Sequence, residues 1–258
     1  MVKRAFSLIS HLSMASIWMH LSRPTMIPMR LGAPRDAGPV LAVLALFPDV
    51  TREQVELTSA QWQGYHLFFW EINCNFFARR SRRLLQFSPK GEFLYLIVRL
   101  QRPAVMVETG VFDGISSSII LQAMEDNGTG SLISIDLPAH QPIAGSTDAM
   151  KESRLPDGCD PGWVIPQYLR HRHRLELGDS RKILPEILQK QSAIDIFLHD
   201  SLHTAEHMRF EYETAWPCLK SSGLLLTYDA IWTPAFHTFS RLRRRSYVRV
   251  DDFAALRK

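Results

Sequence analysis

The second half of the chain alternates between short apolar runs of strand length and longer segments of helical character. The runs that we expect to be strands span residues 104–108, 131–136, 174–179, 194–200 and 223–229. The segments that we expect to be helices span residues 115–127, 180–191 and 203–220. Strands that alternate with helices predict an α/β fold, a doubly wound and mainly parallel sheet with helices on both faces. The tail, residues 247–258, is expected to add a small antiparallel hairpin at the edge of this sheet.

Each of the five expected strands ends at or beside an acidic residue. These residues are Glu108, Asp136, Asp179, Asp200 and Asp229. In open α/β sheets, ligands bind outside the carboxyl ends of the strands. Core packing alone does not explain five acids at this one edge, so the sequence predicts a ligand site lined by carboxylates.

The loop after the first expected strand, "VETGVFDG", narrows the choice of ligand. No lysine follows Gly114, so this is not a phosphate-binding loop of the G-x-x-x-x-G-K-[ST] type. A dinucleotide-binding G-x-G-x-x-G loop starting at Gly110 would need glycines where the chain has Phe112 and Ile115. An acid directly before the turn, Glu108, would also repel a pyrophosphate.

A cationic ligand that contains a ribose suits the same residues better. S-adenosylmethionine carries an ammonium and a sulfonium group, which the Glu108 carboxylate can complement. Asp136 can accept hydrogen bonds from the ribose hydroxyls, as an acid does in dinucleotide-binding folds. Gly110 and Gly114 would let the backbone approach the ligand closely.

The order of motifs in this region resembles that of class I S-adenosylmethionine-dependent methyltransferases. The first two cofactor motifs of that class resemble "VETGVFDGISSSIILQAMEDNGTGSLISIDLP", and the adenine-side motif resembles "LGDSRKILPEIL". A bacterial subgroup near the cephalosporin hydroxylase and macrocin O-methyltransferase families is similar to "DIFLHDSLHTAEHMRFEYETAWPCLKSSGLLLTYDA". The resemblance covers residues 92–233 and implies a Rossmann-like fold. Phe112 stands where the commoner form has another glycine, and many small-molecule O-methyltransferases share this looser form.

The resemblance also implies which residues hold the cofactor. The methionine moiety would be lined by Glu108, Thr109, Gly110, Asp113, Gly114 and Ser116. The ribose hydroxyls would bind Asp136, and the adenine would lie near Asp179 and Ser180. For Asp113 and Ser116 an alternative stays open, because either residue can instead cap the N-terminus of the following helix.

Two further acids, Asp200 and Asp229, mark the side of the site where an acceptor molecule would bind. They end strands that are neighbours in this fold, and neighbouring strands lie about 4.8 Å apart. Two carboxylates at that separation repel each other unless a cation or a proton lies between them. Mg²⁺ prefers such oxygen ligands, and the related families are expected to bind a metal at these positions. Tyr228 stands where those families commonly carry a second acid, so both acids are alternatively hydrogen-bonding partners of loops or substrate.

The stretch "HDSLH" places His203 close to Asp200 at the mouth of the same site. The ordinary pKa of imidazole suits proton transfer near neutral pH. We therefore expect His203 and Asp200 to act together as catalytic residues on the acceptor hydroxyl. The alternative is that His203 only caps the next helix or pairs with Asp200.

Residues 1–90 are expected to form an N-terminal helical extension with a linker, and residues 91–258 the methyltransferase domain. Residues 22–50, rich in proline and glycine, indicate the linker. The sequence "TREQ" from Thr51 predicts a capping box at the start of a helix. The aromatic residues between 62 and 77 fit either a helical core or an aromatic wall over a substrate.

The first 35 residues contain five lysines and arginines and no acid. Their apolar residues recur at helical spacing, which predicts a basic amphipathic helix. Such a helix either lies on a membrane surface or packs on the domain or on a partner subunit, as in a homo-oligomer. No apolar run in the sequence reaches the length of a membrane-spanning helix.

Charge and cysteine content limit the partners and the compartment. The net charge of +4 comes largely from two local basic clusters, which we interpret as solvated helix faces. No nucleic-acid-binding motif accompanies them, so we expect no nucleic-acid partner. The three cysteines are far apart, which indicates a reducing compartment without disulfides or a zinc site. We therefore expect a cytoplasmic protein, peripheral at the inner membrane face if the N-terminal helix binds lipid.

The function expected from these features is transfer of a methyl group from S-adenosylmethionine to a hydroxyl oxygen of a small molecule, a sugar or another natural product. Two alternatives stay open. One is a cephalosporin-hydroxylase-like protein of an oxidation system. The other is a non-catalytic partner protein that binds the cofactor.

Overall fold

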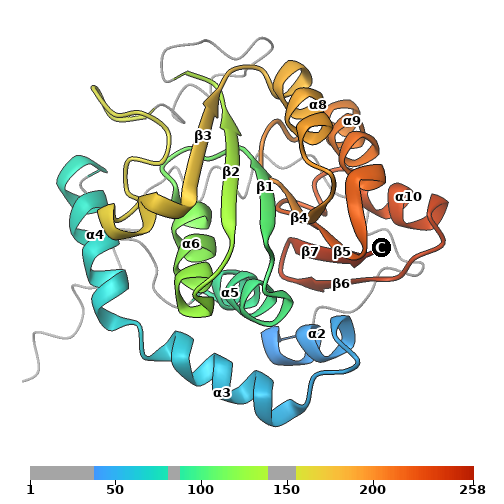
Figure 1. The fold of residues 1–258 in the computed structure, drawn as a ribbon, viewed down its shortest axis with the longest axis horizontal. Coiled ribbons are helices and arrows are strands. Elements are labelled where there is room, and N and C mark those ends of the chain that lie inside the picture. Colours follow the sequence, from blue (N-terminus) through green and yellow to red (C-terminus); the bar gives the residue numbers. More distant parts are fainter. Residues whose placement is uncertain (1–37, 81–87, 139–154) are drawn as a thin grey trace, which may run out of the picture. The chain divides into compact units, whose positions relative to one another are not determined.

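Seven strands form a single sheet at the centre of the fold (Figure 1). The computed structural model describes residues 38–80, 88–138 and 155–258. The strands are β1 (Val105–Thr109), β2 (Ser131–Asp136), β3 (His173–Leu177), β4 (Ile194–His199), β5 (Leu219–Thr227), β6 (Tyr247–Val250) and β7 (Phe253–Arg257). Their order is β3-β2-β1-β4-β5-β7-β6, with β1 to β5 parallel and β7 antiparallel to both β5 and β6. The mainly parallel sheet and the C-terminal hairpin are both as predicted.

The strand order reverses at β1, which lies between β2 and β4. The chain therefore builds β1, β2 and β3 towards one edge and β4, β5 and the hairpin towards the other. The loops that leave β1 and β4 turn to opposite sides of the sheet. Such a switch point leaves room for a ligand at the carboxyl ends of the two strands.

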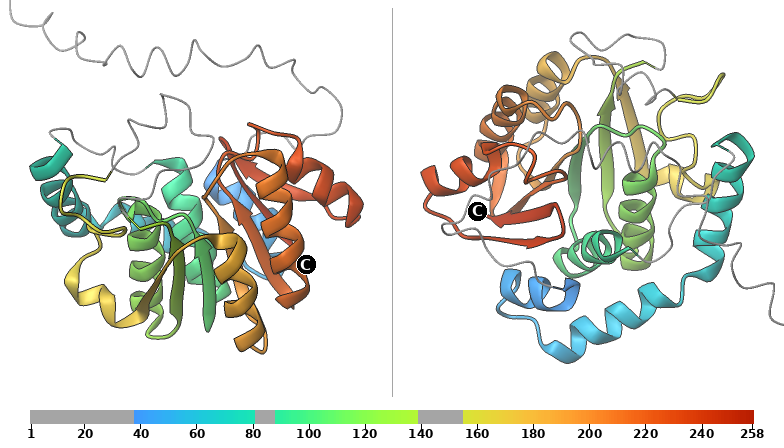
Figure 2. Two further views of the ribbon diagram at one scale, coloured as in Figure 1. Left: turned by 90° about the horizontal axis from the view of Figure 1, so that it is seen from above. Right: turned by 180° about the vertical axis from the view of Figure 1, so that it is seen from behind.

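Helices cover both faces of the sheet, also as predicted (Figure 2). They are α2 (Pro39–Leu46), α3 (Arg52–Gln63), α4 (His66–Arg80), α5 (Pro89–Gln101), α6 (Ile115–Asn127), α8 (Ser180–Lys190), α9 (Ala205–Ala215) and α10 (Ala235–Leu242), with the 3-10 helices η1 (Gln167–Arg172) and η2 (Trp216–Cys218). Helices α2, α5 and α6 pack on one face, and α8, α9 and α10 pack on the other.

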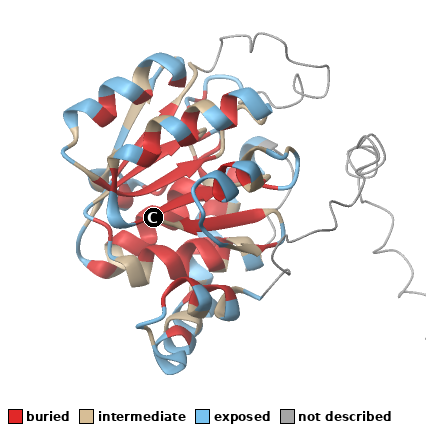
Figure 3. Cartoon of the chain, turned by 90° about the vertical axis from the view of Figure 1, so that its right-hand side faces the viewer, coloured by how far each residue is buried: buried red, intermediate tan, exposed pale blue. Residues whose placement is uncertain are grey.

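Because both faces are covered, the central strands are apolar on both sides. Side chains alternate between the faces along a strand, so Met106 packs with α5 and α6 while Val107 packs with α8 and α9. Leu198 and Phe197 divide in the same way on β4. In Figure 3 the strands are mostly buried, whereas the outer helices expose one side. This double burial explains why the strands read as continuous apolar runs in the sequence.

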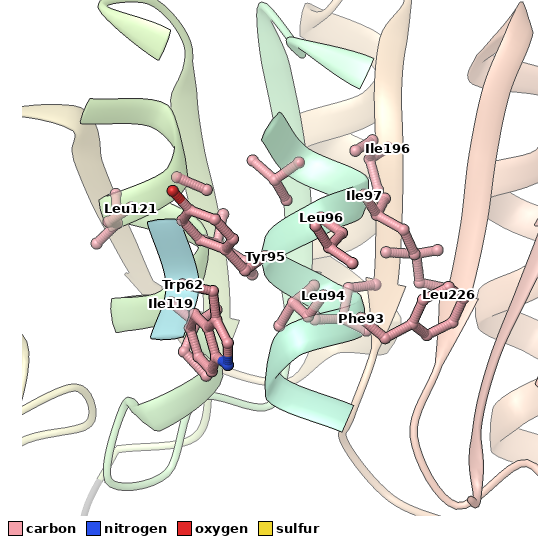
Figure 4. Close-up of a cluster of buried hydrophobic side chains, with 14 of the residues drawn as sticks. Trp62, Phe93, Leu94, Tyr95, Leu96, Ile97, Ile119, Leu121, Ile196 and Leu226 are labelled. Carbon is pink, nitrogen blue, oxygen red and sulfur yellow. The ribbon is translucent and has the colours of Figure 1, made fainter. Parts of the chain in front are cut away.

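Helix α5 is buried along most of its length between α6 and the sheet (Figure 4). Its residue Tyr95 faces Trp62 of α3, with ring centroids 5.3 Å apart. On the opposite side, Phe93 and Ile97 approach Leu226 and Ile196 of the sheet. A helix that is apolar around its whole circumference needs partners on every side, and here the sheet, α6 and α3 supply them.

The aromatic segment before residue 80 belongs mainly to this core. Trp62, Phe68, Phe69 and Phe76 are buried in the same cluster as α5. Core packing is therefore the correct choice of the two alternatives for these four residues. Trp70 and Phe77, in contrast, are exposed on α4.

In the N-terminal part of the described chain, the capping box agrees with the sequence-based expectation, whereas the segment expected as a linker does not. The capping box is confirmed, because Gln54 N donates to Thr51 Oγ1 at 3.2 Å and Thr51 N donates to Gln54 Oε1 at 2.9 Å. The segment expected as linker contains α2, which begins at Pro39. The fixed φ of proline suits the first turn of a helix, and three apolar residues of α2 are buried against the core.

The expected basic helix within residues 1–35 lies outside the described residues. Within the described ranges, the helices are too short or too polar for any of them to cross a bilayer. The described residues all belong to one compact unit.

Candidate cofactor and acceptor site

The loops after β1 and β4 meet at the switch point. Asp200 N donates a hydrogen bond to Thr109 O at 2.8 Å, and Gly110 N donates to Ile135 O at 2.9 Å. Gly110 has φ +81°, and a Cβ atom on it would lie only 2.1 Å from Asp200 O. The glycine is therefore required by the approach of the β4 loop, whereas the sequence suggested the approach of a ligand.

Gly114 has a similar explanation. Its φ is +95°, and a Cβ atom would lie 2.6 Å from the Cα atom of Gly162. Gly162 N donates to Phe112 O at 2.8 Å, and Trp163 Nε1 donates to Asp113 Oδ1 at 2.8 Å. The segment around residue 162 therefore packs directly on the glycine loop and buries the Asp113 side chain.

Neither Asp113 nor Ser116 occupies the N-cap position of the following helix, so the capping alternative is wrong. Gly114 occupies the N-cap position of α6, and no side chain caps this helix. Ser116 Oγ instead donates to Glu108 Oε1 at 2.7 Å.

Glu108 is fully buried beneath this loop. Besides Ser116, its carboxylate accepts hydrogen bonds from Ser117 Oγ at 2.6 Å and Ser134 Oγ at 2.9 Å. Burial raises the pKa of Glu108, while the three serine hydroxyls act in the opposite direction. Glu108 is therefore a buried hydrogen-bonding partner of the loop. Its carboxylate faces serine hydroxyls, whereas the sequence suggested that it would face the cationic part of a ligand.

Asp136 and Asp179 lie at the open edge of the site. One Asp136 oxygen accepts from Val111 N at 2.9 Å and Phe112 N at 2.7 Å, so this carboxylate also fixes the glycine loop. Asp179 is exposed and caps α8 by accepting from Arg181 N at 2.9 Å. Gly178 N donates to Asp136 O at 2.8 Å, which places the ends of β2 and β3 side by side.

His203 lies between the two acids expected at the acceptor side. Its Nε2 atom is 3.8 Å from Asp200 Oδ1 and 3.4 Å from Asp229 Oδ2. The side chain of His203 is 18% exposed. Helix α9 is capped by the Thr204 hydroxyl, which accepts from His207 N at 3.3 Å, so His203 precedes the helix and does not cap it.

The protonation of this group follows from burial. Burial raises the pKa of Asp200 well above its ordinary value, and the neighbouring Asp229 charge adds to the effect. Burial lowers the pKa of His203 to about 3, and the nearby His199 ring acts in the same direction. At neutral pH the imidazole is therefore uncharged, and its pKa of about 3 makes it a weaker base than the ordinary imidazole expected from the sequence.

These residues do not fit a metal held by the protein. His203 Nε2 is within 4 Å of one oxygen of each carboxylate, and the described residues contain no group of three His, Cys, Asp or Glu side chains arranged to hold an ion. A proton on one carboxylate reduces their repulsion, which was the second possibility considered from the sequence. The expected Mg²⁺ at Asp200 and Asp229 is therefore not supported, and we assign no chemical step to it.

Another buried carboxylate, which the sequence did not single out, is that of Glu211 on α9, 0% exposed. Its Oε1 atom accepts from Ser180 Oγ at 2.7 Å, Ser201 Oγ at 2.9 Å and His207 Nε2 at 2.9 Å, and its Oε2 atom accepts from Thr109 Oγ1 at 2.6 Å and His199 Nδ1 at 2.6 Å. Thr109 and Ser180, expected to touch the cofactor, are thus buried partners of Glu211. One signal was available, because Glu211 shares the apolar face of its helix with Met208, Tyr212 and Ala215.

The site also contains a tryptophan that the sequence did not single out. Trp232 follows Asp229, and its ring centroid lies 5.7 Å from that of His203. Its side chain is 47% exposed. It therefore forms an open aromatic surface next to the imidazole.

Comparison with known proteins matches residues 107–230 to a family described as "Methyltransferase domain". No curated protein matches the sequence significantly. The described fold is similar to that of an SAH-bound methyltransferase from Podospora anserina, which is 14% identical with a TM-score of 0.51, over 81% of this chain and 96% of that one.

Two other solved structures are similar to the same extent. An O-methyltransferase from Bacillus cereus in complex with SAH is 14% identical with a TM-score of 0.50, over 79% of this chain and 100% of that one. The calicheamicin methyltransferase CalS11 is 18% identical with a TM-score of 0.51, over 88% of this chain and 98% of that one. At these identities the likeness establishes the Rossmann-like methyltransferase fold.

Proposed function

We propose that this chain, whose residues 107–230 match a family described as "Methyltransferase domain", transfers a methyl group from S-adenosylmethionine to a hydroxyl oxygen of a small molecule. The observation that carries the proposal is the position of His203. A neutral imidazole lies between two carboxylates at the switch point of the sheet. The backbone of Asp200 contacts the glycine loop on which a methyl donor would bind.

The cofactor would bind along the open edge from β1 to β3. Asp136 accepts two backbone hydrogen bonds on one oxygen and one, from Leu137 N, on the other, and its partly exposed carboxylate retains acceptor capacity for ribose hydroxyls. Asp179 is exposed at the neighbouring strand end, on the adenine side. Glu108 would support the cofactor site indirectly, because it lies below the loop and accepts hydrogen bonds from the serines there. The concentration of acids at this edge favours a cationic donor.

The reaction requires the acceptor oxygen to attack the methyl carbon in line with the sulfonium. The O–C bond forms while the S–C bond breaks, and the electron pair of that bond remains on sulfur as S-adenosylhomocysteine forms. The hydroxyl proton goes to His203, whose imidazole is neutral before the step. The Asp229 carboxylate, 3.4 Å from Nε2, would then stabilise the imidazolium. Alignment of the two reactants supplies most of the acceleration.

Calorimetry with S-adenosylmethionine tests the first part of this proposal. We expect saturable binding with one site per chain. A protein that takes up no cofactor at millimolar concentration would refute the proposed donor. Binding without any transfer would instead favour the non-catalytic partner protein considered from the sequence.

Transfer itself is tested with cofactor labelled in the methyl group and a panel of hydroxylated sugars and phenols. His203→Gln is expected to lower kcat by about 100-fold, because general-base catalysis contributes roughly 10²- to 10⁴-fold. His237→Gln, a change on α10 outside this group, is the matched control and is expected to keep wild-type activity. Full activity of His203→Gln would remove the proposed base.

The metal question has a direct test in the same assay. Excess chelator is expected to leave transfer unchanged, because the described residues do not assemble a metal-binding group. Loss of activity on chelation, with recovery on adding Mg²⁺, would restore the metal role of Asp200 and Asp229.

A further inference from the structure

Glu211 lies outside the acceptor site, yet its partners come from three separate segments of the chain besides its own helix. Thr109 ends β1, His199 ends β4, Ser180 starts α8, and Ser201 belongs to the loop after β4. Only His207 comes from the same helix as Glu211. One carboxylate therefore ties together segments that the chain places far apart in sequence.

Each of these segments continues directly into a residue of the proposed site. Thr109 precedes Gly110 in the glycine loop, and Ser180 follows Asp179 on the adenine side. His199 and Ser201 flank Asp200 on the acceptor side. A shift of the Glu211 carboxylate would thus move the loops on the cofactor side of the proposed site relative to the loop on its acceptor side.

The hydrogen bonds of Glu211 also fix the orientation of an imidazole behind His203. A carboxylate can only accept, so His199 Nδ1, at 2.6 Å, must carry its hydrogen. In the neutral ring this leaves Nε2 unprotonated. That atom is buried and has no hydrogen-bond partner within the described residues. The His199 ring lies edge-to-face against His203, with centroids 5.2 Å apart and planes at 72°.

We propose that Glu211 is a positioning residue for methyl transfer, which holds the Asp200–His203 loop against the cofactor loops and, through His199, holds the His203 ring. The inference rests on the proposed function. Burial of a carboxylate is costly unless its oxygens are satisfied, and five donors satisfy this one. Burial by itself raises the pKa of Glu211, but hydrogen bonds from His199 and His207 hold that pKa below its ordinary value.

The test compares Glu211→Gln with Glu213→Gln, an exposed position on the same helix. Glutamine keeps the shape but replaces one accepting oxygen with an NH₂ group, which cannot accept from a hydroxyl or an imidazole N–H. Three properties are measured on the full chain: thermal unfolding, kcat and KM for methyl transfer with an acceptor that the wild type uses, and ¹⁵N-histidine NMR spectra.

Glu213→Gln is expected to match the wild type in all three. Glu211→Gln is expected to unfold cooperatively, to lose the His199 Nδ1–H signal, and to lower kcat by about 10- to 100-fold, the range known for residues that orient other functional groups. We expect KM to change much less than kcat. A folded Glu211→Gln protein with wild-type kcat would overturn the inference.

If Glu211→Gln does not fold, a pair of changes at residue 199 keeps the inference testable. The side-chain amide of His199→Asn can donate to Glu211 much as Nδ1 does, whereas His199→Phe cannot. We expect His199→Asn to retain at least tenfold more kcat than His199→Phe, and equal values would contradict the positioning role.

The outcomes for the inference and for the proposed function are separable. A wild-type chain that binds S-adenosylmethionine and methylates no acceptor contradicts the proposed function, whatever the NMR spectra show. A wild-type chain that is active, together with an equally active and folded Glu211→Gln variant, contradicts only the role of Glu211.

Discussion

The close contact between Gly110 and the loop after β4 allows the glycine loop to be tested by a single methyl group. In Gly110→Ala the new Cβ atom would lie 2.1 Å from Asp200 O and 2.5 Å from Asp200 C. Both are backbone atoms, so no side-chain rotation relieves the clash. The ends of β1 and β4 must separate, and the hydrogen bond from Asp200 N to Thr109 O must lengthen or break.

The expected loss of stability has two parts. An alanine at φ +81° is in the left-handed region, which costs roughly 1–2 kcal/mol for a residue with a Cβ atom. A buried backbone N–H left without its partner costs about 1–3 kcal/mol. Together these predict that Gly110→Ala lowers the free energy of unfolding by about 2–5 kcal/mol.

Gly128→Ala is the matched control because it separates the two parts. Gly128 also has a positive φ, +66°, but a Cβ atom there would meet nothing within 4 Å. Its expected cost is therefore the conformational part alone, roughly 1–2 kcal/mol. Urea unfolding of the two variants, compared at equal m-values, gives the difference directly. If Gly110→Ala is no less stable than Gly128→Ala, the contact between the two loops does not have the energetic role assigned to it.

Two further changes test the fold. Thr51→Ala removes the capping box of α3 and is expected to lower the free energy of unfolding by about 1 kcal/mol in urea, with no effect on cofactor affinity. The pKa of His173 is lowered to about 4 by burial, with Arg170 adding to the effect. The unfolded chain therefore binds this proton first, and the stability present above pH 6.5 falls as the pH drops from about 6.5 towards 4. Between pH 7 and pH 5 we expect the wild type to lose about 1–2 kcal/mol more than His173→Gln, and equal acid sensitivity of the two proteins would contradict the assignment.

The order of elements could be predicted because each depends on residues that are close in sequence. Apolar runs of strand length, the "TREQ" cap and Gly128 after α6 all act within one or two turns of chain. Local periodicity and capping chemistry are therefore sufficient to place such elements. The segment around α2 resembles a linker in sequence because proline and glycine dominate it, and contacts with α5, α3 and β6 stabilise a helix there.

The structure brings the predicted acids to one edge of the sheet, but the contacts that they make there were not predicted. The acids at the strand ends had to meet, because the carboxyl ends of parallel strands share one edge. Their hydrogen-bond partners could not be predicted, because these come from other segments. Glu108 faces three serines, Asp136 holds the glycine loop, and Asp113 accepts from Trp163.

The sequence by itself determined that this chain forms an α/β sheet with acids at the ends of its strands and a glycine loop after the first of them. Only the tertiary structure decided that Gly110 and Gly114 make room for other backbone segments, that His203 lies between Asp200 and Asp229, and that Glu211 connects both sides of the site. The physical reason is distance along the chain. Periodicity and turn chemistry are local, whereas satisfying a buried carboxylate or avoiding a backbone clash depends on segments that meet only after folding.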